Sequence, residues 1–186
     1  MNIFVLDRDP VVAAQMQCDK HVVKMIVESA QMLSSAHRLL DGTKEKRKSV
    51  SGKTMVDYWV HPNSNMENTL YKAVHVKHPD TIWSMLSNNN YNWHYVHFCA
   101  LCDEYTHRYG KVHKTDALLR DILSSTPRNI HVGHLTQQPL AMQSNPECMF
   151  EDVVKSYRAF YHTKQERFKM AWSVREMPNW FTPIQG

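Results

Sequence analysis

One carboxylate, that of Glu28, lies among cations on the most regular stretch of this sequence, residues 19–42. At 3.6 residues per turn, the charged or titratable side chains on its side of a helix are Lys20, Lys24, Arg38 and, at the edge, His21. One interpretation is a solvated face on which Lys24 and Glu28 form a weak i,i+4 ion pair. The other is a reactive carboxylate on a basic wall that faces nucleic acid.

The start of the chain is a second feature that could do chemistry. Residues 3–6 are an apolar run, too short for a helix, and Asp9 with Pro10 then signals a helix start. We expect residues 3–6 to be extended and buried. Their burial would hold the terminal amine near the domain surface, which matters if that amine reacts.

The helix expected over residues 19–42 organises the rest of the chain, with Asp19 as its N-cap and Gly42 as its C′ residue. Its apolar side consists of Val22, Ile26, Ala30, Leu33, Ala36 and Leu40. The sequence predicts further helices over residues 11–17, 64–75, 91–109, 116–123 and 150–170, and a short one beginning at Asp80. We therefore predict an all-α fold, a compact multi-helix domain with a short extended N-terminal segment.

The composition is that of one domain covering residues 1–186, with 42% hydrophobic residues and no break in composition. No apolar run is long enough to span a membrane and no signal-peptide pattern is present, so we expect no membrane partner and a cytoplasmic location. Four cysteines do not form a disulfide scaffold and are expected to be reduced. A net charge of +4 with twelve histidines permits nucleic-acid binding without requiring it.

Two segments are notably basic. Residues 43–53 hold five cations and almost nothing apolar, which predicts a flexible exposed loop that presents Arg47 and Lys48. Such a loop suits either solubility or an arm that gathers phosphates. The second cluster, at the end of the helix over residues 91–109, consists of Arg108, Lys111 and Lys114. There the helix dipole favours cations, and a phosphate contact is the alternative.

Several other chemistries are disfavoured. The five glycines are scattered, which excludes a glycine-rich phosphate loop. His94 and His97 lie one turn apart on an aromatic-rich helix, a spacing more typical of packing residues than of metal ligands. Cys99 and Cys102 have no second CxxC pair to complete a zinc site. We therefore expect neither a metal nor a cofactor.

Three short motifs occur in order along the chain. The first is Asp19-x-His21, followed by two aliphatic residues and, seven residues after the histidine, by Glu28. The others are Glu104-x-x-x-Arg108 just before Gly110, and Pro178-x-Trp180-Phe181. Together these motifs resemble the phage pyrimidine-dimer DNA glycosylases, the small UV-repair endonucleases.

This resemblance implies a mostly helical, monomeric enzyme acting on double-stranded DNA with a damaged or modified pyrimidine. The N-terminal α-amine would attack C1′ of the damaged nucleotide, and β-elimination from the resulting imine would cleave the strand. Since α-amines have an ordinary pKa of about 7.7 to 8.0, part of the population is already the free nucleophile at neutral pH. Glu28 would stabilise the cationic imine and move the proton.

The resemblance also implies roles for other residues. The family's nucleophile is a threonine exposed by loss of the initiator methionine; because Asn2 stands here, the amine is that of Met1 or of Asn2. The side chains that would hold flanking phosphates are Lys20, Lys24 and Arg38. Those that could fill the gap left by opened bases are Trp180 and Tyr58. Arginines that flank the family's glutamate are replaced by Val27 and Gln31.

Two alternatives stay open. One is a non-catalytic phage-type protein that binds nucleic acid or a host protein through the same basic surface. The other is a different helical enzyme, acting on modified nucleobases through Glu28 and a histidine such as His21. The position of the N-terminus discriminates among them, because the imine mechanism needs Met1 beside Glu28.

Overall fold

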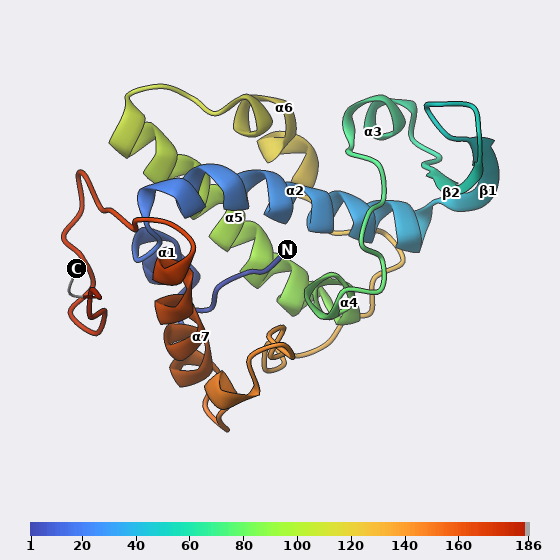
Figure 1. Ribbon diagram of the computed structural model, residues 1–186. Coiled ribbons are helices and arrows are strands. Elements are labelled where there is room, and N and C mark those ends of the chain that lie inside the picture. The colour runs from blue at the N-terminus through green and yellow to red at the C-terminus, as the bar shows by residue number, and fades with distance from the viewer. Residues whose placement is uncertain (185–186) are drawn as a thin grey trace.

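The computed structural model describes residues 1–184, which form helices joined by loops and one pair of strands (Figure 1). The α-helices are α1 (Pro10–Gln15), α2 (Asp19–Asp41), α3 (Ser64–Thr69), α4 (Pro79–Leu86), α5 (Asn88–Tyr109), α6 (Lys114–Leu123) and α7 (Val153–His162). Two 3₁₀ helices flank α7, η1 (Pro146–Cys148) and η2 (Thr163–Glu166). The strands are β1 (Thr43–Lys48) and β2 (Met55–Val60).

The two longest helices, α2 and α5, cross at the centre of the molecule (Figure 1). Helix α2 also packs against α4 and α6, and α5 packs against α1. The predicted apolar side of α2 is confirmed, because its fully buried members are Val22, Ile26, Ala30, Leu33 and Ala36. Among residues 1–184, none of the helices is both long and apolar enough to cross a membrane.

Both ends of α2 differ from the predicted caps. The N-cap is Cys18, and Asp19 lies in the first turn, where it forms an ion pair with Arg108. Gly42 has an extended backbone with φ of −88°, so it does not form a left-handed C′ cap. A Cβ at Gly42 would lie 2.4 Å from the carbonyl oxygen of Arg38. The same Cβ would lie 3.0 Å from the carbonyl oxygen of Val60 at the end of β2, so glycine is required where the end of α2 meets the returning strand.

Other helix bounds also shift. Helix α5 begins at Asn88, before the predicted start at residue 91, because the side chain of Ser87 accepts a hydrogen bond from the Asn90 amide. Helix α7 starts at Val153, capped by Asp152, and gives way to η2, so it is much shorter than the predicted 150–170 helix. Helix α3 ends at Thr69, short of residue 75.

The all-α prediction is wrong, because β1 and β2 pair as an antiparallel hairpin. Residues 43–53 are accordingly a strand and a tight turn, not a flexible loop. The physical reason is that the charges of β1 find partners on β2. The carboxylate of Asp57 lies 2.9 Å from Lys44 and 2.6 Å from Lys46, and Arg47 stacks on the ring of Tyr58. The hairpin projects from the far end of α2, and the fold is mixed α and β (Figure 1).

Candidate functional site

The N-terminal segment runs through the core before α1, as the apolar run of residues 3–6 predicts. Ile3 is fully buried, and its amide donates a hydrogen bond of 3.2 Å to the carboxylate of Asp80 in α4. The side chain of Asn2 donates to the carbonyl of Ala141 at 3.1 Å and accepts from the amide of Phe4. Phe4 has a left-handed φ of 56°, a strained conformation that the surrounding hydrogen bonds and packing hold. These hydrogen bonds and the surrounding packing therefore fix the position of the chain start.

This segment brings the terminal amine to α2. The nitrogen of Met1 lies 3.6 Å from Oε2 of Glu28, and Lys24 lies 3.3 Å from Oε1 of the same carboxylate. Among residues 1–184, Oε2 accepts no hydrogen bond. The Glu28 side chain is only 14% exposed, so its carboxylate is largely shielded from water. An amine and a carboxylate 27 positions apart in the sequence thus share one partly enclosed site.

The amine and Glu28 open into a cleft of about 360 Å³. Its cations come from α2 and from the segment after α7, and they are Lys24, Lys164 and Arg167. Its aromatic walls are Phe4, Phe160 and Phe168. Burial, followed by the nearby charges of Arg167 and Lys24, lowers the pKa of Lys164 to about 8. The cleft therefore combines positive charge with apolar ring surface.

His21 lies in the same cleft but is held as a neutral ring. Its Nδ1 is 2.8 Å from the hydroxyl of Tyr161, and the ring stacks on Phe4 with centroids 4.7 Å apart. Burial, and then the charges of Lys24 and Lys164, lowers the pKa of His21 to about 3. At neutral pH the ring is uncharged and cannot act as a general acid. Its role is therefore to position its neighbours.

The expectation that Arg38 faces solvent is wrong. Its side chain is 1% exposed and makes five hydrogen bonds. One goes to the carboxylate of Glu67 at 2.6 Å, and the others go to backbone carbonyls of Trp59, Glu67, Leu70 and Tyr71. Arg108 is also buried and bonds to Glu104, Asp19 and Gln15. Both arginines hold helices and loops together.

The other predicted cations are exposed but dispersed. Lys20 extends over the ring of Phe168, at the rim of the cleft. Arg47 and Lys48 lie on the hairpin, while Lys111 and Lys114 lie at the junction of α5 and α6, which contributes no lining residue to the cleft.

Trp180 is docked against the body of the protein. Its ring meets that of Tyr161 edge-on, with centroids 6.2 Å apart, and its indole nitrogen lies 3.4 Å from the sulfur of Met16. The guanidinium of Arg158 covers the ring from another side. In this arrangement the indole serves packing, and it is not part of the cleft.

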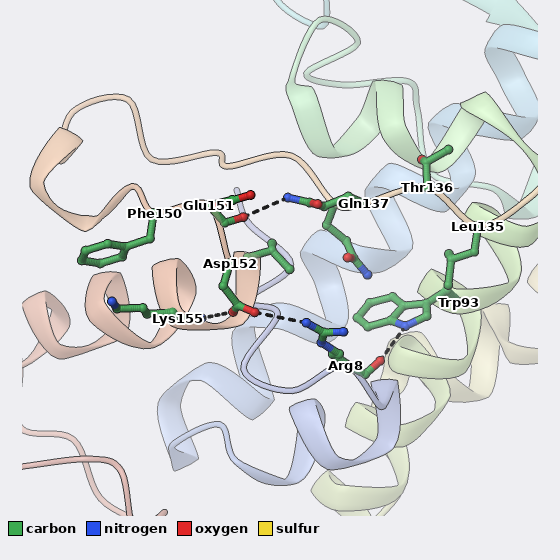
Figure 2. Close-up of a pocket in the computed structure, with 11 residues that line it drawn as sticks. Arg8, Trp93, Leu135, Thr136, Gln137, Phe150, Glu151, Asp152 and Lys155 are labelled. Atoms are coloured by element: carbon green, nitrogen blue, oxygen red, sulfur yellow. Dashed lines mark hydrogen bonds and ion pairs between the residues drawn. The ribbon is translucent and has the colours of Figure 1, made fainter.

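A larger hollow of about 720 Å³ lies between α5, the start of α7 and the loop before η1 (Figure 2). Its polar groups bond to one another. Arg8 donates to the Asp152 carboxylate at 3.2 Å, and Trp93 donates to the carbonyl of Arg8 at 3.1 Å. Gln137 donates to a backbone carbonyl in the same way. Because these groups are mutually satisfied, we place the candidate site at the smaller cleft.

Sequence reasoning missed two residues that line the cleft, Lys164 and Arg167, and one that anchors the chain start, Asp80. Lys164 and Arg167 fall within the helix predicted over residues 150–170, but α7 ends at His162 and the residues after it line the cleft. Asp80 read only as a helix cap. Its fully buried carboxylate lies beneath the chain start, which no local pattern indicates.

The arrangement can support attack by an amine on an electrophilic carbon, with the carboxylate beside it as a proton acceptor. The flanking cations suit an anionic substrate. No protein-family model, characterised protein or solved structure matches this chain significantly. The chemistry of the site therefore has to be argued from its geometry.

Proposed function

We propose that this protein is a DNA N-glycosylase with an associated β-elimination lyase activity on damaged or modified pyrimidines. The observation that carries the proposal is the distance of 3.6 Å between the Met1 amine and Oε2 of Glu28. This is the pair of groups that imine chemistry requires, a nucleophilic nitrogen and a group that can stabilise the cation and move a proton.

The steps follow from the two groups. The unprotonated amine attacks C1′ of the damaged nucleotide, a bond forms between nitrogen and C1′, and the bond to the base breaks as the base leaves with a proton. The C1′–O4′ bond then breaks, O4′ takes up a proton from water, and the nitrogen and C1′ form a cationic imine, which the Glu28 carboxylate stabilises. Glu28 then accepts a proton from C2′, and the C3′–oxygen bond breaks, so that the downstream part of the strand leaves with a 5′ phosphate. Hydrolysis of the imine regenerates the amine.

The surroundings of the pair suit DNA. Lys24, Lys164 and Arg167 supply positive charge for phosphates on either side of the damaged nucleotide. The rings of Phe160 and Phe168 offer flat apolar surface on which an opened base or sugar can rest. We place this activity on double-stranded DNA in the cytoplasm, and we propose that one chain suffices.

The test is borohydride trapping with abasic and UV-irradiated duplexes. Borohydride reduces the imine and leaves a stable protein–DNA adduct, which we expect to map by mass spectrometry to the amine of Met1, or of Asn2 if the methionine is removed. A variant with Gly-Ser placed before Met1 is the control, because its amine is displaced from Glu28 and should give no adduct.

Two outcomes would contradict the proposal. Duplex binding with no trapped adduct would favour a non-catalytic nucleic-acid binder. An adduct on Lys164, whose pKa of about 8 makes it the rival nucleophile in this cleft, would show that the terminal amine is not the reacting group.

A further inference from the structure

A cluster of metal-binding side chains lies at the end of α2, outside the cleft. His37 and Asp41 are one helical turn apart on α2, and His61 follows β2. One ligand atom from each, two imidazole nitrogens and a carboxylate oxygen, lie within 4.8 Å of one another. We propose that His37, Asp41 and His61 bind a divalent transition-metal ion, with Zn²⁺ as the best match to two imidazoles and one carboxylate.

The hydrogen bonds around His37 determine which of its nitrogens is available. The hydroxyl of Tyr91 donates its only proton to the carbonyl of Leu123 at 2.9 Å. Because that proton is used, the contact of 2.9 Å between the Tyr91 hydroxyl and Nε2 of His37 has the histidine as donor. Nε2 therefore carries the ring proton and Nδ1 carries the lone pair. An imidazole held in this way by an outer partner is the usual arrangement for a metal ligand.

The lone pair of His37 points to a buried position. The His37 residue is 1% exposed, and across residues 1–184 its Nδ1 has no hydrogen-bond partner. The backbone of Ser125 lies near the His37 ring and favours its protonated form. Its geometry does not meet that of a hydrogen bond to Nδ1. A buried acceptor without a partner costs free energy, and a bound cation would remove that cost.

His61 and Asp41 complete the set. The side chains are 2% and 3% exposed, and Nε2 of His61 lies 3.9 Å from the nearer oxygen of Asp41. The amides of Arg128 and Asn129 donate to the two oxygens of Asp41 at 2.8 and 2.9 Å, which fixes the carboxylate and leaves each oxygen a second lone pair.

Binding requires two local adjustments. Ligand atoms about 2.0 to 2.2 Å from one ion lie closer together than 4.8 Å, so the rings must move inward. Nδ1 of His61 accepts a bond of 3.2 Å from the Asn63 amide, so Nε2 carries the ring proton and must lose it to the other nitrogen or to solvent. Asn63 is exposed, and water can replace the lost bond.

The position of the cluster suggests what the ion would do. The chain leaves α2 at Asp41, forms the hairpin and returns at His61, so an ion shared by these residues closes the base of the hairpin. This site is separate from the cleft and involves neither the terminal amine nor Glu28. It therefore stands or fails independently of the proposed glycosylase activity.

The experiment is a titration of the chelator-treated protein with Zn²⁺ by calorimetry and with Co²⁺ by visible spectroscopy. We expect one equivalent of either ion to bind, a Co²⁺ spectrum without a thiolate charge-transfer band, and a higher midpoint of thermal unfolding with Zn²⁺. His37→Gln and His61→Gln should each weaken binding more than about 100-fold. Tyr91→Phe, which removes only the outer partner, should weaken it about 10- to 100-fold.

The control is His107→Gln, which removes an exposed histidine of α5 and should leave the affinity unchanged. Binding that persists in both ligand variants would overturn the proposal. So would a wild-type protein that binds no stoichiometric ion, or one whose Co²⁺ spectrum shows thiolate ligation by the free cysteines. These last two results need no variant, so the proposal stays testable even if His37→Gln fails to fold.

Discussion

The carboxylate of Asp80 accepts a hydrogen bond of 3.2 Å from the amide of Ile3, directly beneath the start of the chain. Asp80 is fully buried, and its second oxygen has no hydrogen-bond partner within residues 1–184. Burial raises the pKa of Asp80 to about 7, although the Ile3 amide and the positive chain start act in the opposite direction. The residue that anchors the N-terminal segment is therefore one that titrates near neutral pH.

Asp80→Asn tests this titration. The native carboxyl keeps its proton up to a pKa of about 7, whereas an unfolded aspartate loses it at its ordinary pKa of about 3.9. Between these values only the unfolded state has released the proton, so ionisation of Asp80 lowers the wild-type free energy of unfolding as pH rises. The variant lacks this contribution. Its free energy of unfolding relative to wild type should rise by on the order of 1 kcal/mol per pH unit in that range. Urea unfolding of both proteins from pH 4.5 to 7.5 measures this difference in free energy of unfolding. A difference that does not change with pH would refute the raised pKa of Asp80.

The buried histidines of α5 predict the opposite pH dependence. Burial lowers the pKa of His94 to about 3 and that of His97 to about 4. Both stay neutral in the folded protein while unfolded histidines become protonated below about pH 6.5, so stability present above pH 6.5 is lost as pH falls toward 4. NMR of the two imidazoles during acid titration should show no protonation before unfolding. Protonation of either ring at pH 6 in folded protein would contradict the prediction.

Glu28→Gln should separate chemistry from binding. The amide is nearly isosteric but accepts no proton, so we expect the single-turnover rate of strand cleavage to fall about 10²- to 10⁴-fold. Duplex affinity should change little. Lys24→Gln is the matched control, because it alters one charge on the same helix, one turn away, and should weaken binding while sparing the rate at saturating protein. Equal loss of rate in both variants would mean that the Lys24–Glu28 ion pair, and not proton transfer by Glu28, limits the reaction.

Lys164 should make DNA binding sensitive to alkaline pH. Since the pKa of Lys164 is lowered to about 8, its positive charge is lost as pH rises from 7 to 9, and duplex affinity should fall. Lys164→Arg keeps its charge throughout and should abolish that part of the pH dependence. Lys164→Gln should reduce the salt dependence of binding by about one ion. Lys155→Gln, which removes a cation that lines the larger hollow, should change neither property.

Arg38→Ala should be severely destabilising. It would leave the carboxylate of Glu67 without its buried ion-pair partner and three further residues with unbonded carbonyls, at a cost of roughly 3 to 5 kcal/mol. The control is Lys20→Ala, an exposed cation of the same helix, which should change the free energy of unfolding by less than about 0.5 kcal/mol. Denaturant unfolding of both variants decides the matter. A small effect of Arg38→Ala would mean that water replaces these contacts.

What the sequence could and could not predict follows from the range of the interactions. The core helix was predictable because Val22, Ile26 and Leu33 repeat at the helical period, which is a local property. The hairpin was not, since β1 is a run of charges whose partners on β2, such as Asp57, come several residues later. Arg38 shows the same difficulty. A helical wheel places it on the polar side, but the carbonyls that surround it come from β2, from α3 and from the residues that follow α3, which no local pattern indicates.

The same distinction between local patterns and long-range contacts applies to the candidate site. Periodicity identified Glu28 as one carboxylate among cations, and the motif resemblance pointed to the terminal amine. Neither could predict that Lys164 folds back to the cleft, because that depends on where α7 ends. The cluster that contains His37 and His61 could not be predicted for a similar reason, because the hairpin separates these two residues in the sequence.

The hairpin leaves and rejoins the body at neighbouring points, because Thr43 pairs with Val60 and Gly42 lies close to the carbonyl of Val60. Because its two ends lie next to each other, the hairpin can be lengthened, shortened or replaced by a reporter peptide without displacing the helices. The turn over residues 49–54 is therefore the place to graft a fluorophore.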